Sequence, residues 1–185
     1  MKIVSSGFQP PRQRARTEEI ILFAVAGYTF AIAASAIEEI RSTDGFSSAT
    51  AEITLKEIPK VRHRLRRERK WYYVVNASVH FDLPVSRPTL ILVLRHSCVA
   101  ALVDRIDRME TISRLMAIPR SFSGPERVWY RGLTLIDNNV VPVLNPDGFL
   151  TRDELAQLRA LDDRAGLSSE DDVLPLPGKA EGALL

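Results

Sequence analysis

The apolar positions of this chain fall in short runs, many with a period of two, which is typical of β-strands. Residues 20–23 and 30–34 are predicted strands, and apolar residues alternate before Gly27 (Phe23, Val25) and after it (Phe30, Ile32), which predicts a hairpin. Residues 89–94 and 98–103 are continuous apolar runs separated by a short polar segment, so they predict a second hairpin at the centre of the core. We therefore expect a mainly β fold.

A third hairpin has the most informative turn. Residues 128–136 and 140–144 are predicted strands, and Asp137, Asn138 and Asn139 join them. Asn and Asp tolerate the left-handed backbone that a tight hairpin turn needs. This segment gives the clearest local prediction in the chain.

Several single runs add to the β content. Residues 71–75 are aromatic and β-branched, which strongly favours a strand. Residues 53–55 and 79–83 are further strand candidates, and residues 37–40 are expected to end the strand that begins near position 30. Residues 105–116 fit either a pair of strands or a short helix, and the pattern does not decide between them.

One helix is predicted, near the carboxyl end. Thr151 and Glu154 form a capping-box pattern, in which each side chain can bind an amide of the first turn. The helix is expected over residues 152–164 and to end at Gly166 through a left-handed cap. Its apolar stripe consists of Leu155, Leu158 and Leu161.

Composition places the chain among ordinary globular proteins. The 185 residues are 45% hydrophobic and 26% charged, with a net charge of +2, which is too small to indicate a nucleic-acid partner. A single cysteine and three histidines leave no disulfide framework and predict no structural metal, so we expect a reducing, cytoplasmic location. The folded part is predicted over residues 17–165, between a flexible basic arm (1–16) and a disordered acidic tail (166–185).

The segment 20–37 has no formal charge, so a signal peptide or a membrane anchor has to be weighed against the hairpin. Glu18 and Glu19 precede the segment directly, and Gly27 interrupts it. The hairpin is therefore the favoured interpretation.

No catalytic motif is present in the sequence. His80 and Asp82 are two positions apart in a predicted strand, where they would share a face, but no nucleophile accompanies them, and a solvated strand face explains them better. Cys98 is expected in the core with a raised thiol pKa, and Arg95-His96 at a hairpin tip.

The segment 60–70 carries seven Lys or Arg residues and one Glu. A solvated loop or an exposed edge strand is the favoured interpretation. A second interpretation is a surface that binds an acidic protein partner. A third is a surface that binds a nucleic-acid phosphate backbone beside Trp71, or an anionic membrane.

Spaced residues over three segments resemble the CheW-like coupling domain of chemosensory systems. The first segment matches a strand-turn-strand pattern that ends in a Glu-Ile pair, and its residues are Phe23, Val25, Gly27, Phe30, Ala31, Ile32, Ile37, Glu39 and Ile40. The second is Leu102-Val103-Asp104-Arg105-Ile106. The third consists of Gly132, Leu133, Ile136-Asp137-Asn138, Val140-Val141-Pro142-Val143-Leu144 and Asn145-Pro146.

The resemblance implies two SH3-like five-stranded β-barrel subdomains packed side by side, with the terminal helix covering one of them. It also implies a non-catalytic adaptor that binds the regulatory domain of a CheA-like histidine kinase, and a chemoreceptor tip or another CheW-like protein, with no cofactor and no small-molecule substrate. The alternative function is a nucleic-acid-binding β-barrel that uses residues 60–70.

Three departures from the family pattern stand out. Asn76-Ala77-Ser78 stands where the family usually has N-L-R-G, so the arginine implicated in receptor contact is missing. The basic segment 60–70 is atypical, and Asn145 replaces an aspartate. The residues we select as candidate protein contacts are Arg62, Arg64, Arg66, Arg67, Asn76, Asn138 and Asn139.

Overall fold

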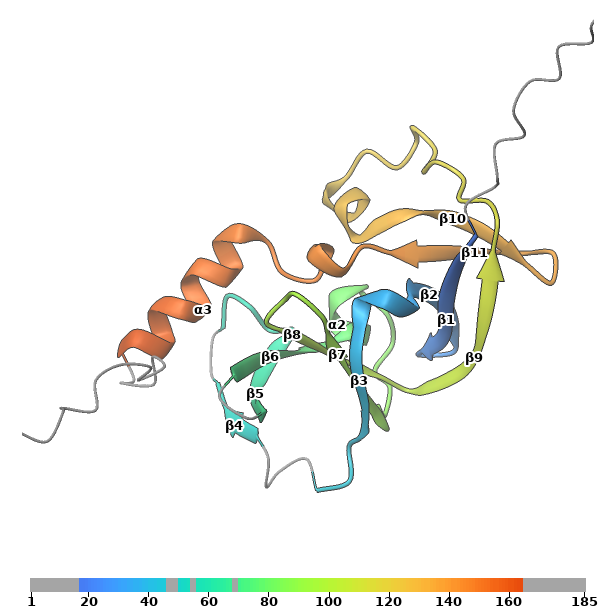
Figure 1. Cartoon of the computed structure of the whole chain (residues 1–185). Coiled ribbons are helices and arrows are strands. Elements are labelled where there is room, and N and C mark those ends of the chain that lie inside the picture. Colours follow the sequence, from blue (N-terminus) through green and yellow to red (C-terminus); the bar gives the residue numbers. More distant parts are fainter. Residues whose placement is uncertain (1–16, 46–49, 54–55, 68–69, 165–185) are drawn as a thin grey trace, which may run out of the picture.

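Two β-sheets packed against each other make up most of the molecule, and one helix lies across the second sheet (Figure 1). The coordinates are a computed structural model, which describes residues 17–45, 50–53, 56–67 and 70–164. The predicted basic arm, the acidic tail and Gly166 lie outside these residues. The mainly β architecture of two subdomains is confirmed.

The first sheet has five strands in the order β10-β11-β2-β1-β9. Its strands are β1 (Glu18–Val25), β2 (Tyr28–Ala33), β9 (Arg105–Ile112), β10 (Tyr130–Ile136) and β11 (Asn139–Leu144). β11 runs parallel to β2, whereas the other neighbours are antiparallel. An isolated bridge between Met116 and Leu133 joins the segment after β9 to β10, so the two edges of the sheet meet at one point.

The second sheet has six strands rather than the predicted five, in the order β3-β7-β8-β6-β5-β4. Its strands are β3 (Ile37–Ser42), β4 (Thr50–Glu52), β5 (Val61–Arg67), β6 (Lys70–Asn76), β7 (Leu90–Leu94) and β8 (Val99–Val103). Over the described residues, neither sheet is hydrogen-bonded all the way round into a closed barrel. The two sheets nevertheless pack against each other as the two predicted subdomains.

All three predicted hairpins are confirmed, and their turns use the expected backbone. β1 pairs with β2 through Ala26 and Gly27, whose φ values are +50° and +84°. β10 pairs with β11 through Asp137 and Asn138, both with positive φ. In the β7–β8 hairpin, His96 at the tip also has a positive φ. Left-handed turn residues match the twist of the flanking strands.

Two of the predicted strand assignments, at residues 79–83 and 37–40, are wrong, and of the predicted strand 53–55 only Ile53 lies among the described residues. Residues 79–83 do not form a strand, because Asn76 caps a short helix, α2 (Ala77–His80), with its side chain. Residues 37–40 do not end the second strand. A 3-10 turn at Ala34–Ala36 separates them, and they enter the other sheet as β3. Ile53 lies just beyond β4, and the undecided segment after position 104 forms β9.

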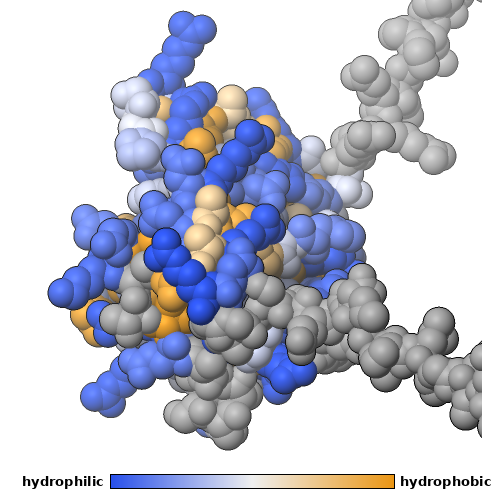
Figure 2. Space-filling view, turned by 90° about the vertical axis from the view of Figure 1, so that its left-hand side faces the viewer, coloured by the Kyte–Doolittle hydropathy of each residue, from blue (hydrophilic) through white to orange (hydrophobic). Residues whose placement is uncertain are grey.

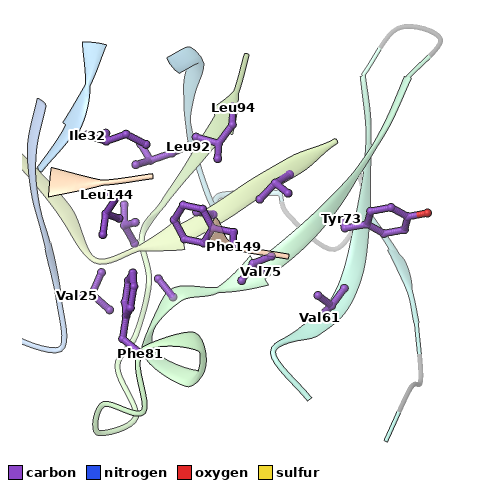
Figure 3. Packing of buried hydrophobic residues seen from close by; sticks show 14 of the residues in the cluster. Val25, Ile32, Val61, Tyr73, Val75, Phe81, Leu92, Leu94, Leu144 and Phe149 are labelled. Carbon is purple, nitrogen blue, oxygen red and sulfur yellow. The ribbon is translucent and has the colours of Figure 1, made fainter. Parts of the chain in front are cut away.

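The largest hydrophobic core lies between the two sheets. Val25 and Ile32 from the first sheet and Leu92 and Leu94 from the second belong to this core, and Figure 3 shows Ile32 next to Leu92. Side chains alternate between the two faces of a strand, so the neighbouring positions of each sheet build a smaller cluster on its opposite side. Long stretches of β1, β2, β7 and β8 are therefore buried on both faces, which explains the continuous apolar runs in the sequence.

The terminal helix α3 (Arg152–Arg164) covers the second subdomain, as predicted. Its Leu158 is fully buried in the central core. The capping box is confirmed, because the amide of Glu154 donates to Oγ1 of Thr151 over 3.2 Å and the amide of Thr151 donates to Oε2 of Glu154 over 2.8 Å. No helix among the described residues has the length and apolar character needed to span a membrane; residues 20–33 instead form the first hairpin.

The second subdomain is inserted into the first. The chain builds β1 and β2, leaves to complete β3–β8, and returns with β9–β11. Asp104 stands at the return point, between β8 and β9, and its Oδ2 accepts a hydrogen bond of 2.6 Å from the amide of Ala26. It therefore ties the first hairpin turn to the crossover between the sheets.

Asp104→Ala is expected to lower the free energy of unfolding by about 1–2 kcal/mol, because the amide of Ala26 loses its partner in a part-buried turn. Urea unfolding followed by circular dichroism measures the change. Asp107→Ala is the matched control, since it removes only the exposed ion pair with Arg105 and should change stability by less than about 0.5 kcal/mol. Equal losses in the two variants would contradict the role assigned to Asp104.

Candidate functional site

His80 and Asp82 do not share a strand face, because α2 and the turn after it replace the predicted strand. His80 is 5% exposed, and its ring centroid lies 4.6 Å from that of Trp129 and 4.8 Å from that of Phe81. Burial, together with the charge of Lys60, lowers the pKa of His80 to about 3. Asp82 is exposed, with φ of +52°. The histidine is thus a neutral member of an aromatic cluster.

Cys98 is only half-buried, and it precedes β8 instead of lying inside it. Burial still raises the pKa of its thiol, as predicted, and the nearby Arg159 opposes that rise. Cys98 therefore packs at the margin of the core, and a thiol with a raised pKa is a weak nucleophile at neutral pH.

The basic segment is neither a loop nor an edge strand over its described part. β5 lies between β4 and β6, and it pairs with both. Arg64 is 5% exposed, and its guanidinium lies 2.6 Å from Oδ1 of Asp162 on α3. Tyr73 donates to Oδ2 of the same carboxylate over 2.6 Å, and burial followed by this contact raises the pKa of Tyr73. One arginine of the segment thus holds the helix on the sheet.

Arg67 also has a structural role. Its guanidinium lies 2.9 Å from Oε1 of Glu38 and 3.1 Å from Oε2 of Glu39, both on β3. β3 is one edge of the same sheet and β5 lies next to the opposite edge, so these ion pairs link strands that are not neighbours in the sheet. Among the four candidate arginines, Arg62 and Arg66 remain exposed.

The aromatic side chain beside this segment is covered by its own arginines. The guanidinium carbon of Arg64 lies 4.8 Å from the ring centroid of Trp71, and that of Arg66 lies 5.7 Å from it. Because stacking on a base needs an open aromatic face, this arrangement does not favour the nucleic-acid interpretation.

Asn76 is engaged in capping. Its Oδ1 accepts hydrogen bonds from the amide of Ser78 over 3.0 Å and from the hydroxyl of Ser78 over 2.8 Å. The position that the resemblance aligns with the receptor-contacting segment therefore starts α2. Asn76, Arg62 and Arg66 belong to the second subdomain, whereas Asn138 and Asn139 belong to the first, so the predicted contact residues do not form one site.

Asn138 and Asn139 lie beside three exposed apolar side chains. We call Tyr28, Leu135 and Val140 the apolar stripe; their exposed fractions are 56%, 58% and 60%. Leu135 and Val140 are cross-strand partners in the third hairpin. β11 pairs with β2 at Val143 and Ala31, and Val140 and Tyr28 each come three residues before that pair. The stripe thus draws on three neighbouring strands of the first sheet, β10, β11 and β2.

The apolar stripe borders a hollow of about 740 Å³. Tyr28 and Val140 line it, together with Leu83 and Tyr130. Charged residues form its rim, among them the exposed ion pair of Arg105 and Asp107, whose nitrogen and oxygen are 2.7 Å apart. An apolar centre with a polar rim is the usual composition of a protein-binding surface.

The stripe was not among the residues selected from the sequence. Leu135 and Ile136 are consecutive in a strand, so only one of them can face the inside of the sheet. Leu135 and Val140 flank a short turn and therefore share a face. From these two facts the sequence could have predicted an apolar pair at Leu135 and Val140. The contribution of Tyr28 could not be predicted, because it depends on the parallel pairing of β2 with β11, which are distant in the sequence.

No group of three or more His, Cys, Asp or Glu side chains among residues 17–45, 50–53, 56–67 and 70–164 could hold a metal ion. A two-sheet β fold with an exposed apolar stripe beside a charged rim is typical of small domains that bind other proteins.

Comparison with known proteins identifies the family. The chain belongs to the CheW-like domain family, whose model matches residues 19–154. A similar solved structure is that of the scaffolding protein TtCheW from Thermoanaerobacter tengcongensis, with a TM-score of 0.58 and 12% sequence identity, covering 70% of this chain and 90% of that one. No curated protein matches the sequence significantly. The family is that of coupling adaptors in chemosensory signalling.

Proposed function

We propose that this chain is a non-catalytic chemosensory adaptor in the cytoplasm, which couples the regulatory domain of a CheA-like histidine kinase to a chemoreceptor tip or to another CheW-like protein. The observation that supports this most strongly is the family match across nearly the whole folded part of the chain. The two-sheet fold and the exposed apolar stripe agree with it.

We assign the kinase contact to the apolar stripe. The regulatory domain of such a kinase resembles this chain in fold, and binding between small β-subdomains depends on apolar anchors at their ends. Leu135 and Val140 are cross-strand neighbours, and Tyr28 lines the same hollow as Val140, so the three provide such anchors. Asn138 and Asn139 at the neighbouring turn are exposed and would supply polar contacts at the rim.

The receptor contact is expected to differ from the usual one. Asn76-Ala77-Ser78 stands here in place of the N-L-R-G segment, so the arginine is missing, and Asn76 is occupied as the cap of α2. We expect a receptor or another regulator to contact other residues of the second subdomain, where Arg62 and Arg66 are exposed.

Val140→Asp is expected to weaken the complex with a CheA-type regulatory domain by at least about tenfold, because it places a charge at the centre of a desolvated contact. Isothermal titration with the purified regulatory domain measures the affinity. The matched control is Val85→Asp, the same change at a side chain that is 97% exposed, outside the stripe, and its affinity should stay within about twofold of the unmodified chain.

The titration also tests the function itself. If the unmodified chain forms no complex with the regulatory domain at tens of micromolar protein, the adaptor proposal fails. A dissociation constant in that range corresponds to a binding free energy on the order of −6 kcal/mol. If it binds and both variants bind equally well, the adaptor proposal stands and the stripe is not the contact.

A further inference from the structure

A second, larger hollow separates the first half of α3 from the tip of the β7–β8 hairpin. It has a volume of about 1070 Å³, and we call it the basic groove. Figure 2 views the molecule from the side of α3, where hydrophilic side chains surround strips of apolar ones. The apolar part of the groove includes Val99, Leu150 and Leu155, of which Val99 is buried and the two leucines are half-buried.

Positive charge predominates along this groove. Lys70, Arg95, Arg152 and Arg159 line it, and none of them forms an ion pair with another residue in the described part of the chain. Two acidic residues also line it, and one of them, Glu38, is already paired with Arg67. An apolar floor between unpaired cations fits an acidic segment that also carries apolar residues.

Arg152 points to an anionic occupant independently. It is the first residue of α3, where the unpaired amides of the helix give a partial positive charge. A cation at that position costs helix stability, and no described carboxylate pairs with Arg152 to offset the cost. An anion bound in the groove would interact favourably with both the arginine and the end of the helix.

A segment of this chain has the matching composition. Residues 165–185 contain four acidic residues and one lysine. Three of the acids are consecutive, Glu170-Asp171-Asp172, and Val173, Leu174 and Leu176 follow them. The segment thus presents negative charge next to apolar side chains, in the same combination as the groove.

The segment is also long enough to reach the groove. The acidic residues come six to eight positions after Arg164, the end of α3, and an extended chain covers about 20–26 Å over that distance. Along α3, Arg159 lies about 8 Å and Arg152 about 18 Å back from Arg164. A tethered segment has an effective concentration in the millimolar range, so weak contacts suffice to hold it.

We propose that residues 170–177 fold back along α3 and dock in the basic groove, with the acidic residues at Arg152 and Arg159 and the leucines on the apolar floor. The segment then covers this face of the second subdomain, and it competes with any acidic partner that approaches the same cations. The inference does not depend on which protein the adaptor binds.

The single cysteine provides a direct test, because Cys98 lines the groove. Alkylation of the full chain by the neutral reagent iodoacetamide is expected to be at least about fivefold slower than alkylation of the full-length variant Glu170→Gln/Asp171→Asn/Asp172→Asn. About 0.5 M salt should remove most of that difference. Glu181→Gln is the matched control, since it removes an acidic residue outside the docking segment, and it should react at the rate of the unmodified chain.

A charge swap separates docking from a general change in thiol reactivity. Arg152→Glu should speed alkylation as the tail variant does, although it should leave α3 intact because an acidic residue suits the first turn of a helix. Combining it with Asp171→Lys should restore part of the protection. Thermal melting of each variant checks that the fold is kept.

Three results would overturn the proposal. Equal rates for the unmodified chain and the neutralised tail variant would mean that another occupant, or none, uses the groove. Protection that disappears on dilution from about 100 μM to about 1 μM would assign the groove to the tail of a second copy, because tethered docking does not depend on concentration. Failure of the charge swap to restore any protection would reject the assigned pairing.

Discussion

Lowering the pH from about 7 to about 4 is expected to destabilise this protein by about 3 kcal/mol through one side chain, His80. Its pKa in the folded chain is about 3, against an ordinary value of 6.5, because the ring is buried and Lys60 lies nearby. Between these two values the unfolded chain binds a proton at His80 that the folded chain does not. Stability is therefore unaffected by His80 above about pH 6.5 and falls as the pH drops toward 3.

The measurement is the midpoint of urea unfolding at several pH values. His80→Phe removes the titrating group and keeps an aromatic ring beside Trp129 and Phe149. Between pH 7 and pH 4 this variant should therefore lose about 3 kcal/mol less stability than the unmodified chain. His96→Asn, at the exposed hairpin tip, is the control, and its pH dependence should equal that of the unmodified chain. A His80→Phe variant with the same pH dependence as the unmodified chain would disprove the assignment.

Asp162→Ala is expected to lower the free energy of unfolding by about 3 kcal/mol. The substitution leaves the buried guanidinium of Arg64 without its counter-charge and the hydroxyl of Tyr73 without its acceptor. Nε of Arg64 has no hydrogen-bond partner among the described residues, so Asp162 is the main compensation for this charge. Tryptophan fluorescence, to which Trp71 under Arg64 and the half-buried Trp129 both contribute, is a suitable probe of urea unfolding.

Asp163→Ala is the matched control, because it makes the same change at the next, exposed position of α3, where solvent screens any interaction of the carboxylate, and a loss of less than about 1 kcal/mol is expected. Arg64→Met combined with Asp162→Ala should be more stable than Asp162→Ala alone, since it also removes the unpaired buried charge. If the double variant were less stable than Asp162→Ala, the cost would lie in lost packing and not in the charge.

The hairpins and the terminal helix could be predicted from the sequence because the determining interactions are local. Asp137 and Asn138 set the turn between β10 and β11, and the bonds between Thr151 and Glu154 begin α3. Three residues or fewer separate the interacting groups in each case. The family resemblance then supplied the arrangement of the subdomains, which no local pattern contains.

The errors arise where a local pattern permits two structures or where the partner is distant. Residues 79–83 alternate like a strand, but Asn76 can accept the amide of Ser78 two positions later, and this local bond starts α2 instead. Arg64 looks like a solvated charge until α3 brings Asp162, 98 positions away, within 2.6 Å of it. The same holds for Arg67, whose carboxylate partners lie on β3.

The insertion of one subdomain into the other also sets the order in which the protein can be assembled. During synthesis β1 and β2 leave the ribosome first, but β11, which pairs with β2 through Val143 and Ala31, follows more than a hundred residues later. The second sheet is complete before that, so it can fold while the first hairpin still lacks its neighbours on both sides. Such long-range pairing slows folding and leaves apolar edges open to aggregation in the meantime.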